Sequence, residues 1–302
     1  MHDSGACDRT LRYALVKLVS VNDSNDLSLT FGGTVVVGNL KLLYCSLVKF
    51  SCNSNTGTGF FLRFNSRLFV VTAAHVLANK TEISFEYAND CTDWIENRLK
   101  RVVLDPDEVY QYDRHFYNEK DVTAIHISTD GSPEKGVDGD VDIPNCFDLD
   151  SCQIFDEVEI GTQAYSLGFP VHIKDESQPT FDPDRAILRS GLVIDRHVLD
   201  GKCKVLWDDG TQHSENFENR KVLVLQVPTF PGDSGSPVVS ADAGGINLIG
   251  VMTNVIPLAK DIRPFFGTGR KEYRTANLSS SGICTGDSIT DLMNWIKSVC
   301  PR

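Results

Sequence analysis

The chain has 302 residues, of which 41% are hydrophobic and 23% are charged, so it can bury a substantial core and has an ordinary globular composition. Its 29 basic and 41 acidic residues give a net charge of -12, which excludes the electrostatic attraction on which nucleic-acid-binding proteins depend. No nucleic acid partner is therefore expected. No run of about 18 apolar residues occurs, so no membrane-spanning helix and no membrane partner are expected either.

The N-terminus and the cysteines bear on the cellular compartment. Residues 1–9 lack the basic start and apolar run of a secretory signal, which favours the cytoplasm. The nine cysteines include no Cys-x-x-Cys pair, so no zinc site is expected, and no other metal or cofactor is predicted. Free thiols are favoured, with a partial set of disulfides as the alternative.

Taken in chain order, the first 34 residues are polar and mixed, and we predict them to be an N-terminal extension. Short apolar runs rich in Val, Ile, Leu and Phe follow, separated by clusters of Gly, Pro, Asn and Asp, as is typical of all-β sandwiches and barrels. We predict two β-barrels, the first over 35–160 and the second over 161–302. The predicted strands fall at 40–50, 59–64, 68–72, 122–127, 164–167, 186–194, 222–227 and 246–251.

Three segments depart from the strand pattern. Residues 89–117 are charged and irregular, which predicts a long surface insertion, and 130–150 are rich in Gly, Pro and Asp, which predicts a solvated loop. Near the end of the chain, Asp287 or Ser288 is expected to cap a helix. Its apolar positions share one face: Ile289, Leu292, Met293 and Ile296.

The segment 227–239 reads VPTFPGDSGSPVV and carries a candidate nucleophile. A serine hydroxyl needs a base to take its proton and donors to bind the oxyanion that develops. A tight Gly-x-Ser turn would expose Ser234 and direct the backbone N–H groups of Gly232 and Ser234 to one point. The predicted oxyanion hole is thus Gly232, Asp233 and Ser234. Taken alone, such a turn between strands is also common as a purely structural element.

A histidine and an aspartate complete the candidate set. His75 follows an apolar strand that ends in Thr-Ala-Ala, and Asp121 opens the apolar run 122–127. Either residue alone is more often structural, but the order His, Asp, Ser in one β-rich chain is that of the chymotrypsin class. The orders of α/β-hydrolases and subtilisins differ, and Ser236 stands where an α/β-hydrolase has the last glycine of its motif.

Three short blocks resemble the catalytic blocks of trypsin-like serine peptidases: 72–75 (TAAH), 121–125 (DVTAI) and 232–237 (GDSGSP). Together with 248–254 (LIGVMTN), the last block is closer to the bacterial, HtrA-like branch. The resemblance implies two perpendicular six-stranded antiparallel barrels with the site in the cleft between them, and a C-terminal helix. It assigns His75 as base and then acid, Asp121 as the residue that fixes the histidine tautomer, and Ser234 as nucleophile.

Departures from the family pattern bear on activation and specificity. No cysteine follows His75, so the histidine-loop disulfide is absent. The Ile-Val-Gly-Gly activation sequence is also missing, so activation by a new N-terminus that pairs with Asp233 is not expected. Pro228 stands six residues before Ser234, where tryptic enzymes carry an aspartate, so small or apolar substrate side chains are expected. The resemblance implies the following pocket residues: Pro228, Thr229, Thr253, Asn254 and Gly282.

We therefore predict a serine endopeptidase that acts on protein or peptide substrates through an acyl-enzyme. The alternative is a catalytically latent module that uses a protease fold for binding or regulation, since fold alone does not establish activity. Hydrolysis of esters by the same serine is also chemically possible.

Overall fold

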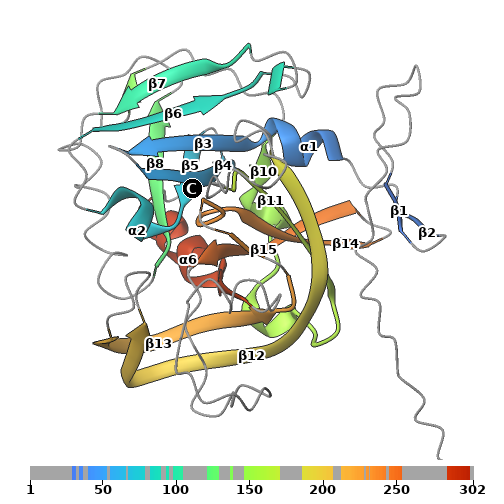
Figure 1. Cartoon of the computed structure of the whole chain (residues 1–302), viewed down its shortest axis with the longest axis vertical. Helices are drawn as coiled ribbons and strands as arrows, with labels where there is room; N and C mark the ends of the chain where they lie inside the picture. The colour runs from blue at the N-terminus through green and yellow to red at the C-terminus, as the bar shows by residue number, and fades with distance from the viewer. Residues whose placement is uncertain are drawn as a thin grey trace, which may run out of the picture.

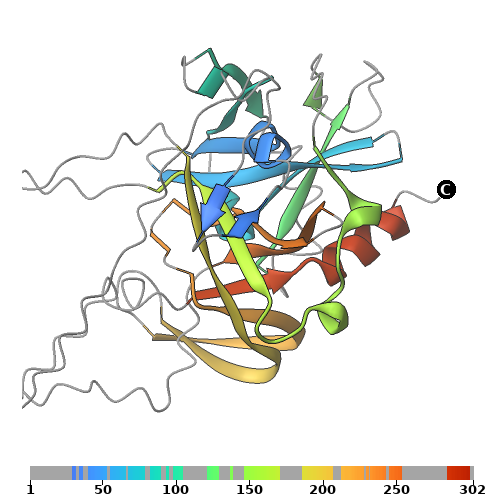
Figure 2. The same ribbon diagram turned by 90° about the vertical axis from the view of Figure 1, so that its right-hand side faces the viewer.

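Two β-sheets pack against each other, an open sheet built from the first half of the chain and a closed barrel built from the second (Figure 1). In this computed structural model the described residues are 29–31, 34–36, 40–52, 55–65, 67–78, 82–89, 93–94, 98–104, 121–128, 137–138, 146–170, 186–206, 212–227, 229–230, 232–242, 245–253 and 284–299. Helix α6 (Thr290–Val299) lies beside both units (Figure 2). Strands β1 (Leu29–Phe31) and β2 (Thr34–Val36) pair with each other.

The first sheet curves into a half-barrel, and its central strands are buried on both faces. Its central strand, β4, carries the apolar run GFFL at 59–62, which is typical of a strand covered on both sides. Phe61 faces an aromatic cluster inside the half-barrel, whereas Phe60 and Leu62 face the second unit. In the described residues the strand order is β7-β6-β3-β4-β5-β8-β9, with β10 beside β4. The bounds are β3 (Leu47–Cys52), β4 (Asn55–Phe64), β5 (Arg67–Thr72), β6 (Ile83–Tyr87), β7 (Lys100–Leu104), β8 (Thr123–Ser128), β9 (Val137–Asp138) and β10 (Phe147–Asp148).

The second sheet closes in the order β11-β12-β13-β16-β15-β14. Strands β12 and β13 form a long hairpin, whose register shifts between Val193 and Asp195 and between Leu199 and Gly201. Gly191 lies where a Cβ would overlap the carbonyl oxygen of Gln226, so the two strands approach closely there. The bounds are β11 (Gln163–Gly168), β12 (Ile187–Leu206), β13 (Gln212–Leu225), β14 (Pro237–Asp242), β15 (Gly245–Thr253) and β16 (Cys284–Ser288).

The largest apolar core lies between the half-barrel, the barrel and helix α6. Its contributors come from all three: Phe60, Leu62, Val71, Tyr165, Leu167, Val239, Leu248, Leu292, Met293 and Ile296. The buried residues of α6 recur at helical spacing, while Asn294 and Lys297 on its other face are exposed. In the part of the chain that the structure describes, no helix is long and apolar enough to cross a membrane.

The predicted all-β fold with two barrel-like sheets and a C-terminal helix is confirmed, and the first sheet is a half-barrel. The helix cap is Ser288, whose Oγ accepts the Thr290 N–H at 3.3 Å. Asp287 is not a cap, because Arg220 binds its carboxylate inside the protein. We propose the division into 35–160 and 161–302 as the two structural units.

Three local predictions were wrong. Residues 40–45, expected as strand, form helix α1 (Leu40–Cys45), because a short apolar run does not distinguish a helix from a buried strand. The charged stretch 89–117 contains β7, and the stretch 130–150 contains β10 with Phe147 and the adjacent Leu149 in the core. The buried Leu104 anchors β7, and the buried Phe147 and Leu149 anchor the second stretch.

Two identical substitutions test the placement of the core. Val71 is fully buried between the units, whereas Val103 on β7 is 72% exposed. We expect Val71→Ala to lower the free energy of unfolding by about 1.5–3 kcal/mol, because it removes buried methyl groups and leaves a cavity. Val103→Ala is expected to change it by less than about 0.5 kcal/mol. Urea denaturation followed by circular dichroism measures both, and equal losses would contradict this core.

Candidate active site

The three residues of the predicted triad come from three different elements. His75 lies in the one-turn helix α2 (Ala74–Leu77), and Asp121 stands just before β8. Ser234 lies in the turn that precedes β14. The backbone N–H of Ala74 donates to the Asp121 carbonyl at 3.3 Å, which fixes the end of β5 to the start of β8.

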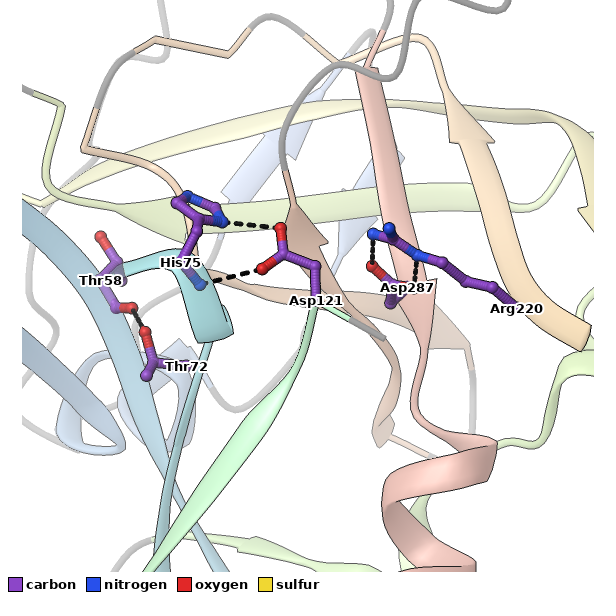
Figure 3. A network of polar contacts seen from close by, with 6 residues as sticks. All are labelled: Thr58, Thr72, His75, Asp121, Arg220 and Asp287. Carbon is purple, nitrogen blue, oxygen red and sulfur yellow. Dashed lines mark hydrogen bonds and ion pairs between the residues drawn. The ribbon is translucent and has the colours of Figure 1, made fainter. Parts of the chain in front are cut away.

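Asp121 holds His75 through both of its carboxylate oxygens (Figure 3). His75 Nδ1 lies 2.6 Å from Asp121 Oδ2, and the His75 backbone N–H donates to Oδ1 at 3.0 Å. Because a carboxylate accepts hydrogen bonds, Nδ1 carries the proton and Nε2 of the neutral ring is left as the basic nitrogen. The two side chains are 29% and 19% exposed, so the pair is largely shielded from water.

The environment keeps Asp121 ionised. Burial by itself raises the pKa of this carboxyl group, but the charge and the hydrogen bonds of His75 lower it, and the charge of Arg220 lowers it further. The lowering effects outweigh burial, so the pKa of Asp121 lies below its ordinary value of 3.8. An ionised carboxylate is what an imidazolium at His75 would need as its partner.

The serine turn has a conformation that depends on glycine. Gly232 and Gly235 have φ values of +94° and +88°, in the left-handed region that other residues rarely adopt. The Asp233 N–H donates to the Phe230 carbonyl at 3.0 Å, and the Gly235 N–H donates to the Met252 carbonyl at 2.7 Å. These bonds fix the turn at both ends.

Two backbone N–H groups of the turn make no hydrogen bond to a carbonyl in the part of the chain that the structure describes. They are the N–H groups of Gly232 and Ser234. These are the two donors that the sequence assigned to the oxyanion hole, together with the intervening Asp233.

Thr58, which the sequence analysis did not single out, attaches the serine turn to the first sheet. Its backbone N–H donates to the Ser234 carbonyl at 2.9 Å, and its Oγ1 donates to the Gly232 carbonyl at 2.8 Å. A Cβ at Gly235 would overlap the Thr58 carbonyl and approach the Ala73 nitrogen to 2.9 Å. The turn therefore lies against the segment that ends two residues before His75.

A second unforeseen residue, Arg189, supports the turn from inside the barrel. Its Nη1 lies 2.6 Å from Asp233 Oδ2, with the two side chains only 7% and 1% exposed. The same carboxylate oxygen accepts the Phe230 N–H at 2.7 Å, and the Phe230 ring lies 5.3 Å from the guanidinium. An arginine inside the apolar run 186–194 was the only sequence signal of this buried charge.

Two of the five predicted pocket residues lie within the described residues. Thr229 is 6% exposed and hydrogen-bonds the thiol of Cys284, and Thr253 at the end of β15 is 3% exposed. Burial raises the pKa of Cys284 to about 12, so its thiol stays protonated and is not a nucleophile. The other three predicted pocket residues lie outside the described residues: Pro228, Asn254 and Gly282.

Known proteins resemble this chain in sequence pattern and in fold. The family model of the trypsin-like peptidase domain matches residues 57–251, a segment that spans more than half of the chain and includes all three triad positions. An inactive-form mutant of Rv3671c from M. tuberculosis H37Rv matches at 16% identity and a TM-score of 0.44, over 86% of this chain and 90% of that one.

Two further solved structures are similar. The HtrA-type protease AlgW with a tripeptide matches at 15% identity and a TM-score of 0.44, over 84% of this chain and 60% of AlgW. The MamO protease domain from Magnetospirillum magneticum, in its apo form, matches at 15% identity and a TM-score of 0.42, over 86% of this chain and 98% of that one. No curated protein sequence matches the chain.

Removal of Arg189 tests the support of the serine turn. We expect Arg189→Met to lower the free energy of unfolding by about 3–5 kcal/mol, because it leaves the Asp233 carboxylate buried without its cation. Arg196→Met is the matched control, since Arg196 lies on the same strand but is only partly buried and bonds carbonyl groups. Adding Asp233→Asn to Arg189→Met should recover part of the loss. Equal effects of Arg189→Met and Arg196→Met in urea denaturation would contradict this role.

Proposed function

The chain belongs to the trypsin-like peptidase family, and on that footing we propose that it is a serine endopeptidase whose nucleophile is Ser234. The observation that carries the proposal is the doubly hydrogen-bonded pair of His75 and Asp121, together with a serine turn that lies against Thr58 and against Ala73, two residues before His75. A histidine held by a carboxylate in one tautomer is the arrangement that a serine nucleophile requires.

In the proposed reaction His75 Nε2 takes the proton of Ser234 Oγ while Oγ attacks the carbonyl carbon of the scissile peptide bond. The resulting imidazolium is stabilised by Asp121, which stays ionised, and it then donates its proton to the leaving nitrogen as the C–N bond breaks. A water molecule attacks the acyl-enzyme with His75 again as base, which releases the carboxylic acid and restores the Ser234 hydroxyl.

The backbone N–H groups of Gly232 and Ser234 would bind the oxyanion of each tetrahedral intermediate. Backbone donors that are fixed before the reaction need no reorganisation when the charge develops, and loss of one such donor typically lowers turnover about 10²–10³-fold. Thr58 and Arg189 would contribute indirectly, because they hold the turn from which both donors project.

Labelling with a fluorophosphonate tests whether the site is assembled. We expect a covalent adduct on Ser234, mapped by peptide mass spectrometry, because only an activated serine reacts rapidly with this reagent. The adduct should be absent in Ser234→Ala and in His75→Ala, with circular dichroism confirming that both variants are folded. A folded wild-type protein that gives no adduct would instead favour a catalytically latent binding module.

Substitution of Asp121 tests its orienting role. Asp121→Asn should lower kcat for a fluorogenic peptide pool about 10⁴-fold, because an amide at this position favours the wrong histidine tautomer. Asp195→Asn is the matched control, since Asp195 also pairs with a histidine, His197, at 3.0 Å on the surface. The control should retain the wild-type rate. A similar small effect of both substitutions would contradict the assignment of Asp121.

A further inference from the structure

We propose that the second barrel binds an internal water molecule beneath the serine turn, held by Ser166, Ser236 and Arg189. The site goes beyond the proposed function and does not depend on it, because it concerns how the turn is supported and not which reaction the turn performs. The side chains that form it are buried and polar, and their bonding groups find no partners among the described residues.

Three buried side chains carry polar atoms that need a partner. The hydroxyls of Ser166 and Ser236 are fully buried, and neither makes a hydrogen bond within the part of the chain that the structure describes. There, Arg189 Nη2 also lacks an acceptor, and Nη1 approaches Asp233 Oδ2 at 2.6 Å as an ion pair without the direction of a hydrogen bond. Buried polar groups nearly always bond to protein or to ordered water, so these groups require a ligand.

The strand register brings the three side chains to one place. Ser166 on β11 lies directly opposite Arg189 on β12, and residues opposite each other in antiparallel strands point to the same face of the sheet. Ser166 also lies opposite Val238 on β14. Ser236, two residues before Val238, is therefore the diagonal neighbour of Ser166 on that face.

This face is the interior of the barrel. Ala164, two residues before Ser166, and Val238, two residues after Ser236, both belong to the apolar core of the barrel. Side chains two residues apart on a strand share a face, so both serines point inward, and Arg189 points inward opposite Ser166. The interior therefore changes from apolar to polar next to the serine turn.

Gly168 on β11 lets the polar groups of the turn come close to this wall. A Cβ at Gly168 would overlap Ser236 Oγ and would lie 3.0 Å from Asp233 Oδ1 and 3.1 Å from Thr58 Oγ1. Because glycine lacks this atom, three oxygen atoms gather beside the backbone of β11, two residues from Ser166. The polar groups of the turn and of the wall thus lie within the reach of one small ligand.

A water molecule matches the bonding capacity of these groups. It can accept a hydrogen bond from Arg189 Nη2 and donate one to each serine hydroxyl, which gives the three bonds that internal waters typically make. A dry arrangement would leave three groups unbonded, and each such group typically lowers the folding equilibrium constant roughly 5–150-fold. A small anion fits less well, because the Asp233 carboxylate that pairs with Arg189 would repel it.

The water adds a second link between the serine turn and the barrel wall. The first link is the ion pair of Asp233 with Arg189 on β12. The second runs from Ser236, at the other end of the turn, through the water to Ser166 on β11 and to Arg189. The turn is thereby attached to two neighbouring strands and not to one.

A high-resolution crystal structure of the wild-type protein tests the site directly. We expect one ordered water within about 2.5–3.2 Å of Ser166 Oγ, Ser236 Oγ and Arg189 Nη2. Direct hydrogen bonds among these side chains, or no density between them, would overturn the proposal. An anomalous peak at this position in a bromide-soaked crystal would also overturn it, because the site would then bind an anion.

A double-mutant cycle in urea denaturation tests the site in solution. Ser166→Ala and Ser236→Ala remove hydroxyls that do not bond to each other, and each should raise the unfolding equilibrium constant roughly 5–30-fold. If both hydroxyls bind one water, the first substitution releases it and the second then costs less. The double variant should therefore fall roughly 3–30-fold short of the product of the two effects. A double variant that reaches the full product would overturn the shared site.

Ser240→Ala is the matched control. Ser240 is another buried serine of β14, and its hydroxyl donates to the Gln153 side chain at 3.2 Å. Combined with Ser166→Ala, it should give the product of the two single effects to within about twofold. An equal shortfall in both cycles would contradict a specific link between Ser166 and Ser236. Neither test needs turnover or labelling of Ser234, so failure of this site and failure of the proposed function are distinguishable.

Discussion

The two halves of the candidate active site meet through the hydrogen bonds of a single threonine. Thr58 donates its N–H to the carbonyl of Ser234 and its hydroxyl to the carbonyl of Gly232, and its own hydroxyl oxygen accepts the N–H of Phe169. Its carbonyl accepts the hydroxyl of Thr72 at 2.6 Å. His75 follows Thr72 closely on the first unit, and Ser234 belongs to the second. The position of the candidate base relative to the candidate nucleophile therefore depends on these bonds.

Buried charge is concentrated around that junction, whereas the cores elsewhere are apolar. Asp121, Asp233 and Asp287 each have a cationic or protonatable partner from another segment: His75, Arg189 and Arg220. The low dielectric constant of the interior strengthens each ion pair and raises the free energy of a buried charge that has lost its partner. These contacts therefore specify one arrangement of the loops more sharply than apolar packing would. The site thus depends on polar contacts that span long distances in the sequence.

This dependence explains which features the sequence could predict. The apolar strands and the blocks around His75, Asp121 and Ser234 have local patterns, and the fold class follows from them. The buried ion pairs have no such local pattern. Nothing in the sequence near Arg189 or Arg220 indicates which aspartate each arginine binds. Asp287 fits the local pattern of a helix cap, and only the strand register reveals that it is an ion-pair partner.

The lowered pKa of Asp121 couples the geometry of the site to the stability of the fold. A carboxyl group whose pKa lies below its ordinary value of 3.8 binds a proton less readily in the folded than in the unfolded state. Its contribution to stability is therefore fully present above that value and is lost as the pH falls through the folded pKa. The proton that removes this stability also removes the charge that holds His75. Acid thus weakens the fold and disorganises the base in the same range of pH.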